Sequence, residues 1–163
     1  MMGAGKSTVG SLLAARLGWV FVDLDAMIVE RVGLSIAEIF ARHGEERFRL
    51  YEETCLFESL TPSTPTVLAL GGGTVERQAN RDVLRGQHLI WIDADPEILY
   101  KRAKGPDRPL AHAGLANFLE RYRRREPLFR ELAAFRIDVT TRVPEDIVDQ
   151  IVRYETNPNL RRS

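Results

Sequence analysis

The order of apolar segments along this chain constrains its fold more than any other feature. Stretches with apolar residues at helical spacing alternate with short apolar runs at 19–22, 66–70, 88–92 and 136–139. Continuous apolar runs of this length are typical of buried strands in a parallel sheet, whose faces are then covered by the intervening helices. We therefore predict an α/β fold. Because no linker or repeat divides the chain, we expect one domain over residues 1–163.

Local signals place several helix ends. Ser35 and Glu38 have the spacing of a capping box, so we expect a helix to begin there and to break at Gly44. Further helices are predicted over 6–17, over 45–60, from Pro96 onward, over 115–125 with an interruption near Pro127, and over 144–154.

Composition excludes several classes of protein. The 163 residues carry 23 basic and 23 acidic side chains, which argues against the globally basic surface of a dedicated nucleic-acid-binding protein. No apolar run approaches the roughly 20 residues that a membrane span needs, and the N-terminus lacks the pattern of a signal peptide. No membrane partner is therefore expected. Cys55 is the only cysteine, so a reducing cytoplasm is the expected compartment.

The zero net charge conceals an asymmetry. Residues 101–136 carry a net charge of +6, and the rest of the chain carries −6. Such a basic block is either a solvated helix face or an anion site, because the arginine fork binds phosphate and carboxylate through two hydrogen bonds. Both interpretations stay open at this point.

A phosphate-binding motif stands at the start of the chain. Gly5-Lys6-Ser7 matches the end of the pattern G-x-x-x-x-G-K-[ST], in which backbone N–H groups surround phosphate oxygens. Lys6 would reach the β- and γ-phosphates, and the Ser7 hydroxyl is a ligand for Mg²⁺. The first glycine of the pattern and the strand before it would precede Met1. We therefore expect the native chain to start upstream, and a chain starting at Met1 to bind ATP weakly.

Acidic and glycine residues follow two of the predicted strands. Asp23 and Asp25 come after the first strand, and Gly71-Gly72-Gly73 comes after the second. In parallel sheets ligands bind at the carboxyl ends of the strands, so these residues are expected to face one site. One aspartate would serve magnesium and the other would accept a proton; a helix-capping aspartate is the simpler alternative. The triple glycine would either offer a backbone donor to a ligand or form a flexible turn.

In order and spacing these residues resemble shikimate kinases, which are small P-loop kinases of the nucleoside-monophosphate-kinase-like group. The resemblance rests on the segments 3–8, 23–25, 35–40, 44–45, 48–49, 52–53, 71–73, 108–110 and 125–129. It implies a three-layer fold with strand order 2-3-1-4-5. Strand 1 is expected to be absent from this chain, leaving a gap between the strands at Thr66 and His88. It also implies a substrate-binding segment over about 25–60 and a mobile lid over about 105–115.

The resemblance further implies ATP-dependent phosphorylation of the 3-hydroxyl of shikimate, in aromatic amino-acid biosynthesis. Asp25 would bind the substrate hydroxyls and act as the base. Arg49 and Arg125 would pair with the substrate carboxylate, with Glu52 holding Arg49, and the Gly72 N–H would bind substrate.

For the nucleotide, the resemblance implies ATP with Mg²⁺. Ser7 and Asp23 would bind the metal ion, and Lys6 and Arg108 would neutralise charge on the transferring phosphoryl group. The nucleotide-binding residues implied are Gly3, Ala4, Gly5, Lys6, Ser7, Thr8, Arg102, Arg108 and Pro144. Arg102 and Pro144 match positions that enclose the adenine, and a monomer is expected.

Three other functions stay open. These are another small-metabolite kinase such as a gluconate kinase, a nucleotide-binding module without turnover, and RNA binding by the arginine-rich helix. Arg121 to Arg124 are expected to form a solvated face, and Trp19 and Trp91 to lie in the core.

Overall fold

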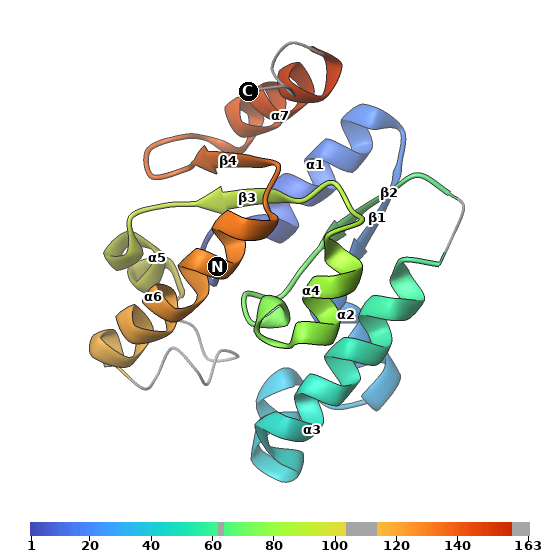
Figure 1. Cartoon of the computed structure of the whole chain (residues 1–163), viewed down its shortest axis with the longest axis vertical. Coiled ribbons are helices and arrows are strands. Elements are labelled where there is room, and N and C mark those ends of the chain that lie inside the picture. Colours follow the sequence, from blue (N-terminus) through green and yellow to red (C-terminus); the bar gives the residue numbers. More distant parts are fainter. Residues whose placement is uncertain (62–63, 104–113, 158–163) are drawn as a thin grey trace.

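The computed structural model describes residues 1–61, 64–103 and 114–157, in which helices alternate with short strands (Figure 1). The strands are β1 (Val20–Asp23), β2 (Thr66–Ala69), β3 (Ile90–Asp93) and β4 (Phe135–Asp138). Each of the four predicted strands is present, with ends shifted by one or two residues. The prediction of an α/β fold is confirmed.

Helices fill most of the remaining described chain. They are α1 (Lys6–Leu17), α2 (Leu24–Val32), α3 (Ile36–Ser59), α4 (Gln78–Leu84), α5 (Pro96–Ala103), α6 (Gly114–Leu132) and α7 (Pro144–Thr156), with a 3₁₀ turn η1 (Thr74–Glu76). Helix α2 was not predicted, because it follows β1 without any connecting loop. Among these helices none is long and apolar enough to cross a lipid bilayer.

The strands form two parallel pairs. β1 pairs with β2 from Val20 opposite Thr66, and β3 pairs with β4 from Ile90 opposite Phe135. Within the described residues no strand pairing joins β2 to β3. The strand order implied by the family resemblance predicts a gap in the sheet between these two strands. A cleft of about 430 Å³ lies between the two pairs, and apolar residues of both line it, among them Leu68.

The packing around β3 and β4 gives three layers. On one face, Trp91 of β3 stacks on Phe129 of α6, with ring centroids 5.7 Å apart, and Arg136 of β4 lies over the Trp91 ring. On the other face, Phe135 of β4 stacks on Tyr154 of α7. Helix α7 also packs against α1, and α1 contacts both β1 and β2. The phosphate motif at the start of α1 is thereby attached to both halves of the molecule.

Two helix interruptions and the two tryptophans differ in how well local signals predict them. α3 runs from Ile36 to Ser59 but has a non-helical residue at Gly44 (φ 77°, ψ 171°), so the expected break is a kink. The expected interruption near Pro127 is wrong: α6 continues through Pro127, and Phe129 and Leu132 beyond it are buried. Packing of that last turn outweighs the hydrogen bond that proline removes. Trp91 is buried as expected, whereas Trp19 is 47% exposed.

Candidate active site

The phosphate motif forms a tight turn that leads into α1. Gly3 and Gly5 both have φ of 78°, a left-handed conformation that favours glycine, and Gly5 is the residue from which α1 starts. Lys6 Nζ donates a hydrogen bond to the Met1 carbonyl at 2.9 Å. The backbone N–H groups of this first turn and the partial positive charge of the helix end make the turn suited to an anion.

Asp23 connects the phosphate motif to α2. Its Oδ2 accepts a hydrogen bond from Ser7 Oγ at 2.5 Å, and its Oδ1 accepts from the backbone N–H groups of Asp25 and Ala26. Asp23 is therefore the N-cap of α2. The capping interpretation holds for Asp23, but its second oxygen faces Ser7. Asp25 lies in the first turn of α2, an orientation set by this cap.

The triple glycine provides space for neighbouring side chains. A Cβ at Gly71 would lie 2.7 Å from Glu52 Oε1 and 3.4 Å from Asp25 Oδ1. A Cβ at Gly73 would lie 2.4 Å from Arg49 Nη2. Any side chain at Gly73 would therefore displace the Arg49 guanidinium. The glycines are required here for close approach, beyond the two roles that we expected.

Arg49 is a buried cation held by carboxylates. Its Nη1 donates to Glu52 Oε2 at 2.8 Å, and Thr74 Oγ1 donates to the other Glu52 oxygen at 2.7 Å. Its Nη2 pairs with Glu45 at 3.0 Å. Burial disfavours the charged guanidinium, but these carboxylates outweigh it and raise the pKa of Arg49. Glu52 therefore holds Arg49 in place, as the family resemblance implied.

Glu76 was missed by sequence reasoning. The Arg125 side chain is 5% exposed, and its Nη2 pairs with Glu76 at 3.0 Å. The same carboxylate also pairs with Arg49 and with Arg124. Burial would raise the pKa of Glu76, but Arg125, Arg124 and Arg49 outweigh burial and hold it below its ordinary value. The sequence signal that was available is an acid three residues after the triple glycine.

These elements surround one cleft of about 190 Å³ between the phosphate motif and α3. The predicted site residues that line it are Gly3, Gly5, Lys6, Ser7, Thr8, Asp23, Asp25, Arg49, Gly72 and Arg125. Phe40 and Phe48 add an apolar wall. The cleft therefore combines a turn suited to an anion, three carboxylates (Asp23, Asp25 and Glu52) and two arginines from distant parts of the sequence.

Among the predicted site residues that the structure describes, three are not among those that line the cleft. Ala4, which lies within the turn, is buried. Arg102 of α5 donates to the carbonyls of Val139 and Thr140, close in sequence to Pro144 at the start of α7. Arg102 thus contacts the segment that leads into α7, outside the cleft. Arg108, together with most of the expected lid, lies outside the described residues.

Comparison with known proteins decides the family. The family model described as shikimate kinase matches residues 2–155, which is nearly the whole chain. The chain belongs to the shikimate kinase family. The prediction made from the sequence segments is confirmed, and with it a kinase that uses ATP as co-substrate.

Relatives and solved structures agree with the family. The shikimate kinase of Geobacter sulfurreducens is 43% identical over 160 residues, covering 94% of this chain and 86% of the relative. That of Symbiobacterium thermophilum is 39% identical over 158 residues, covering 93% and 90%. The structure of Acinetobacter baumannii shikimate kinase in complex with shikimate superposes with a TM-score of 0.90 at 32% identity, covering 94% of this chain and 88% of that one. The predicted P-loop kinase fold is thereby confirmed.

Proposed function

We propose that this protein transfers the γ-phosphoryl group of ATP to the 3-hydroxyl of shikimate, in the synthesis of aromatic amino acids. The observation that carries this proposal is the convergence of Arg49 and Arg125 with Asp25 and the phosphate motif on one small cleft. A small polyhydroxylated carboxylate needs a cationic clamp at one end and hydrogen-bond acceptors at the other. The cleft offers both, next to a turn suited to phosphate.

The carboxylate end of the substrate is proposed to bind Arg49 and Arg125. Both side chains are nearly buried yet belong to the cleft lining, so a carboxylate there would be bound in a low-dielectric environment. Arg125 Nε is a buried donor without a hydrogen-bond partner in the described residues. The Gly72 N–H is proposed as a further donor to the substrate.

The nucleotide is proposed to bind the turn at 3–8 with its phosphates near Lys6, and its adenine near Arg102 and Pro144. Ser7 and Asp23 offer two oxygen atoms in hydrogen-bond contact, a donor set that suits the hard Mg²⁺ ion. Bound there, the ion would neutralise phosphate charge. This chain's own contribution is to orient the phosphates through the helix end and to pair Lys6 with them.

Asp25 is the proposed base. The substrate hydroxyl oxygen attacks the γ-phosphorus, the bond from that phosphorus to the bridging oxygen breaks, ADP leaves, and the hydroxyl proton passes to Asp25. Asp25 is oriented by the Asp23 cap beneath it. Arg108 is proposed to neutralise the transferring group. Correct placement of both reactants supplies most of the acceleration in such transfers.

We also propose that residues 1–163 act as a single monomeric domain in the cytoplasm. Residues 25–60 would form the substrate-binding segment, and residues 105–115 would form the lid. The single thiol, Cys55, is buried and free, which suits a reducing compartment. Sedimentation or light scattering tests the monomer.

A coupled ADP-release assay with a substrate panel tests the function. Turnover with shikimate and none with gluconate is the expected result. Turnover with gluconate alone would identify another small-metabolite kinase. ATP binding without turnover of any substrate would identify a nucleotide-binding module.

A further inference from the structure

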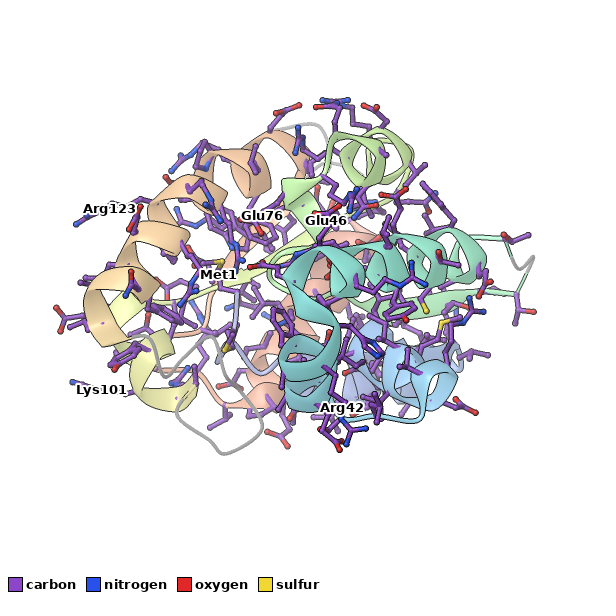
Figure 2. The ribbon with its side chains drawn as sticks, turned by 90° about the horizontal axis from the view of Figure 1, so that it is seen from below. Met1, Arg42, Glu46, Glu76, Lys101 and Arg123 are labelled. Carbon is purple, nitrogen blue, oxygen red and sulfur yellow. The ribbon has the colours of Figure 1, made fainter. Side chains whose placement is uncertain are left out.

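Glu76 lies between two segments that are distant in sequence. It ends the 3₁₀ turn that follows the triple glycine, and Figure 2 shows it between the ribbons of α6 and α3. Its Oε2 pairs with Arg125 Nη2 at 3.0 Å and with Arg49 Nη2 at 3.4 Å. One oxygen atom thus links the two arginines that line the cleft.

The second oxygen of Glu76 is fixed as well. Arg124 Nη2 pairs with Oε1 at 2.5 Å, and the Arg124 side chain is largely exposed. Both carboxylate oxygens of Glu76 are therefore engaged, and the plane of the carboxylate is set by the two helices on either side. Arg124 was expected to belong to a solvated face, and its exposure agrees, but it also anchors Glu76.

The charges explain why such a link matters. Two guanidinium groups in a poorly solvated cleft repel each other unless a carboxylate lies between them. Arg49 has Glu52 and Glu45 as further partners. For Arg125, in contrast, Glu76 is the one carboxylate partner within the residues that the structure describes. Arg125 thus depends on Glu76 more than Arg49 does.

Glu76 itself does not belong to the residues that form the cleft lining in the described structure, whereas Arg49 and Arg125 do. Its carboxylate therefore contacts the two arginines without occupying the space that a ligand would take. This geometry suits a residue that holds the two arginines in place. It argues against a role in which Glu76 competes with the ligand for them.

We infer that Glu76 is a positioning residue that selects for carboxylate substrates by holding Arg125 beside Arg49. The inference rests on the proposed function, because it assigns the carboxylate of the substrate to these two arginines. Glu76 acts through them and touches neither reacting group.

The test compares Glu76→Gln with Glu46→Gln in steady-state assays. Glu46 is a matched control, because its exposed carboxylate pairs with Arg77 and with neither cleft arginine. In E76Q we expect the KM for shikimate to rise about tenfold, because a hydrogen bond between charged groups is lost. We expect kcat and the KM for ATP to stay within about twofold of wild type, because the hydroxyl end and the nucleotide are untouched. E46Q should match the wild type.

A substrate without the charge separates positioning from a merely structural role. With the methyl ester of shikimate, kcat/KM should be the same for wild type and E76Q, so the preference for the acid over the ester falls about tenfold. If E76Q fails to fold, Arg124→Gln serves instead, because that side chain is exposed, and a smaller change in the same preference is expected.

Two results would overturn the inference. One is a preference for shikimate over its methyl ester that is the same in E76Q and in E46Q. The other is a KM for shikimate that is lower in E76Q than in the wild type, which would mean that Glu76 competes with the substrate carboxylate. Either result leaves turnover of shikimate by the wild type intact. Absence of that turnover would instead refute the proposed function, and the inference with it.

Discussion

The two sides of the cleft are built in different ways. On the side of the arginines, charged side chains hold one another: Arg49 is paired with Glu52, and Arg125 with Glu76. On the side of the phosphate motif, backbone geometry dominates, because Gly5 adopts a left-handed conformation and Lys6 bonds to a main-chain carbonyl. One side is therefore determined by side-chain charge, and the other by the path of the chain.

This difference teaches where the two sides are vulnerable. Removing one carboxylate from the arginine side leaves a buried guanidinium with less compensation for its charge, which affects folding as well as binding. A side-chain change on the phosphate side removes a ligand contact with little effect on packing. Substitutions on opposite sides should therefore separate stability from activity.

Glu52→Gln is expected to have the largest effect. Glu52 is 1% exposed and accepts from Arg49 and from Thr74, so the amide would leave Arg49 without its buried counter-charge. The free energy of unfolding should fall by about 3–5 kcal/mol. Urea denaturation measures it. Glu53→Gln is the control, because its pair with Arg77 is partly exposed and is expected to contribute about 1 kcal/mol or less. If E52Q and E53Q lose the same unfolding free energy, the proposed importance of buried charge pairs on the arginine side is refuted.

Lys6→Ala tests the phosphate side. We expect kcat to fall about 10²- to 10³-fold, because a cation at the transferring phosphate is lost. Thermal unfolding should change far less than in E52Q. Steady-state kinetics and a melting curve on the same sample check both statements, and a stability loss as large as that of E52Q would contradict the comparison.

A pair of glycine variants sharpens the contrast further. In Gly73→Ala the new methyl group meets the Arg49 guanidinium, so we expect a cost of about 1–3 kcal/mol and a raised KM for shikimate. In Gly5→Ala the new Cβ has no neighbour within 4 Å among the described residues other than adjacent parts of its own chain, so the cost of about 1–2 kcal/mol comes from the left-handed φ. The KM for ATP should rise in G5A and stay unchanged in G73A.

The smallest expected effect is a dependence on pH. The folded-state pKa of Glu76 lies below the ordinary value of 4.5, so its ionised form stabilises the fold. That stabilisation is fully present above about pH 4.5 and is lost as the pH falls through the folded-state pKa. The unfolding free energies of wild type and E76Q should therefore converge on acidification. The pH-dependent part is expected to be about 1 kcal/mol or less, because Glu76 is partly solvated. A gap that widens toward low pH would contradict the assignment.

Much of the site could be predicted because its residues stand in short motifs or directly after strands. Lys6, Ser7, Asp23 and Asp25 are recognised in this way, since the local chain fixes their position. Arg49 and Arg125 were predicted through the family resemblance, and the structure brings both to the cleft.

The parts that could not be predicted depend on contacts between distant segments. Glu76 belongs to no motif, and its role arises only because η1 packs against both α3 and α6. The continuation of α6 through Pro127 depends on burial of its last turn, which local propensity does not describe. The exposure of Trp19 depends on how other segments pack around the residue that precedes β1, and the local sequence does not determine that packing.

The close contact at Gly73 has a consequence for sequence drift. Because the guanidinium of Arg49 occupies the space where a side chain at position 73 would lie, the two positions are not free to vary independently. A larger residue at 73 requires the Arg49 guanidinium to move away from its carboxylate partners, or a shorter side chain at 49 that lacks the cation. In lineages that keep the arginine, purifying selection on the glycine should therefore be strong, even though the glycine carries no functional group of its own.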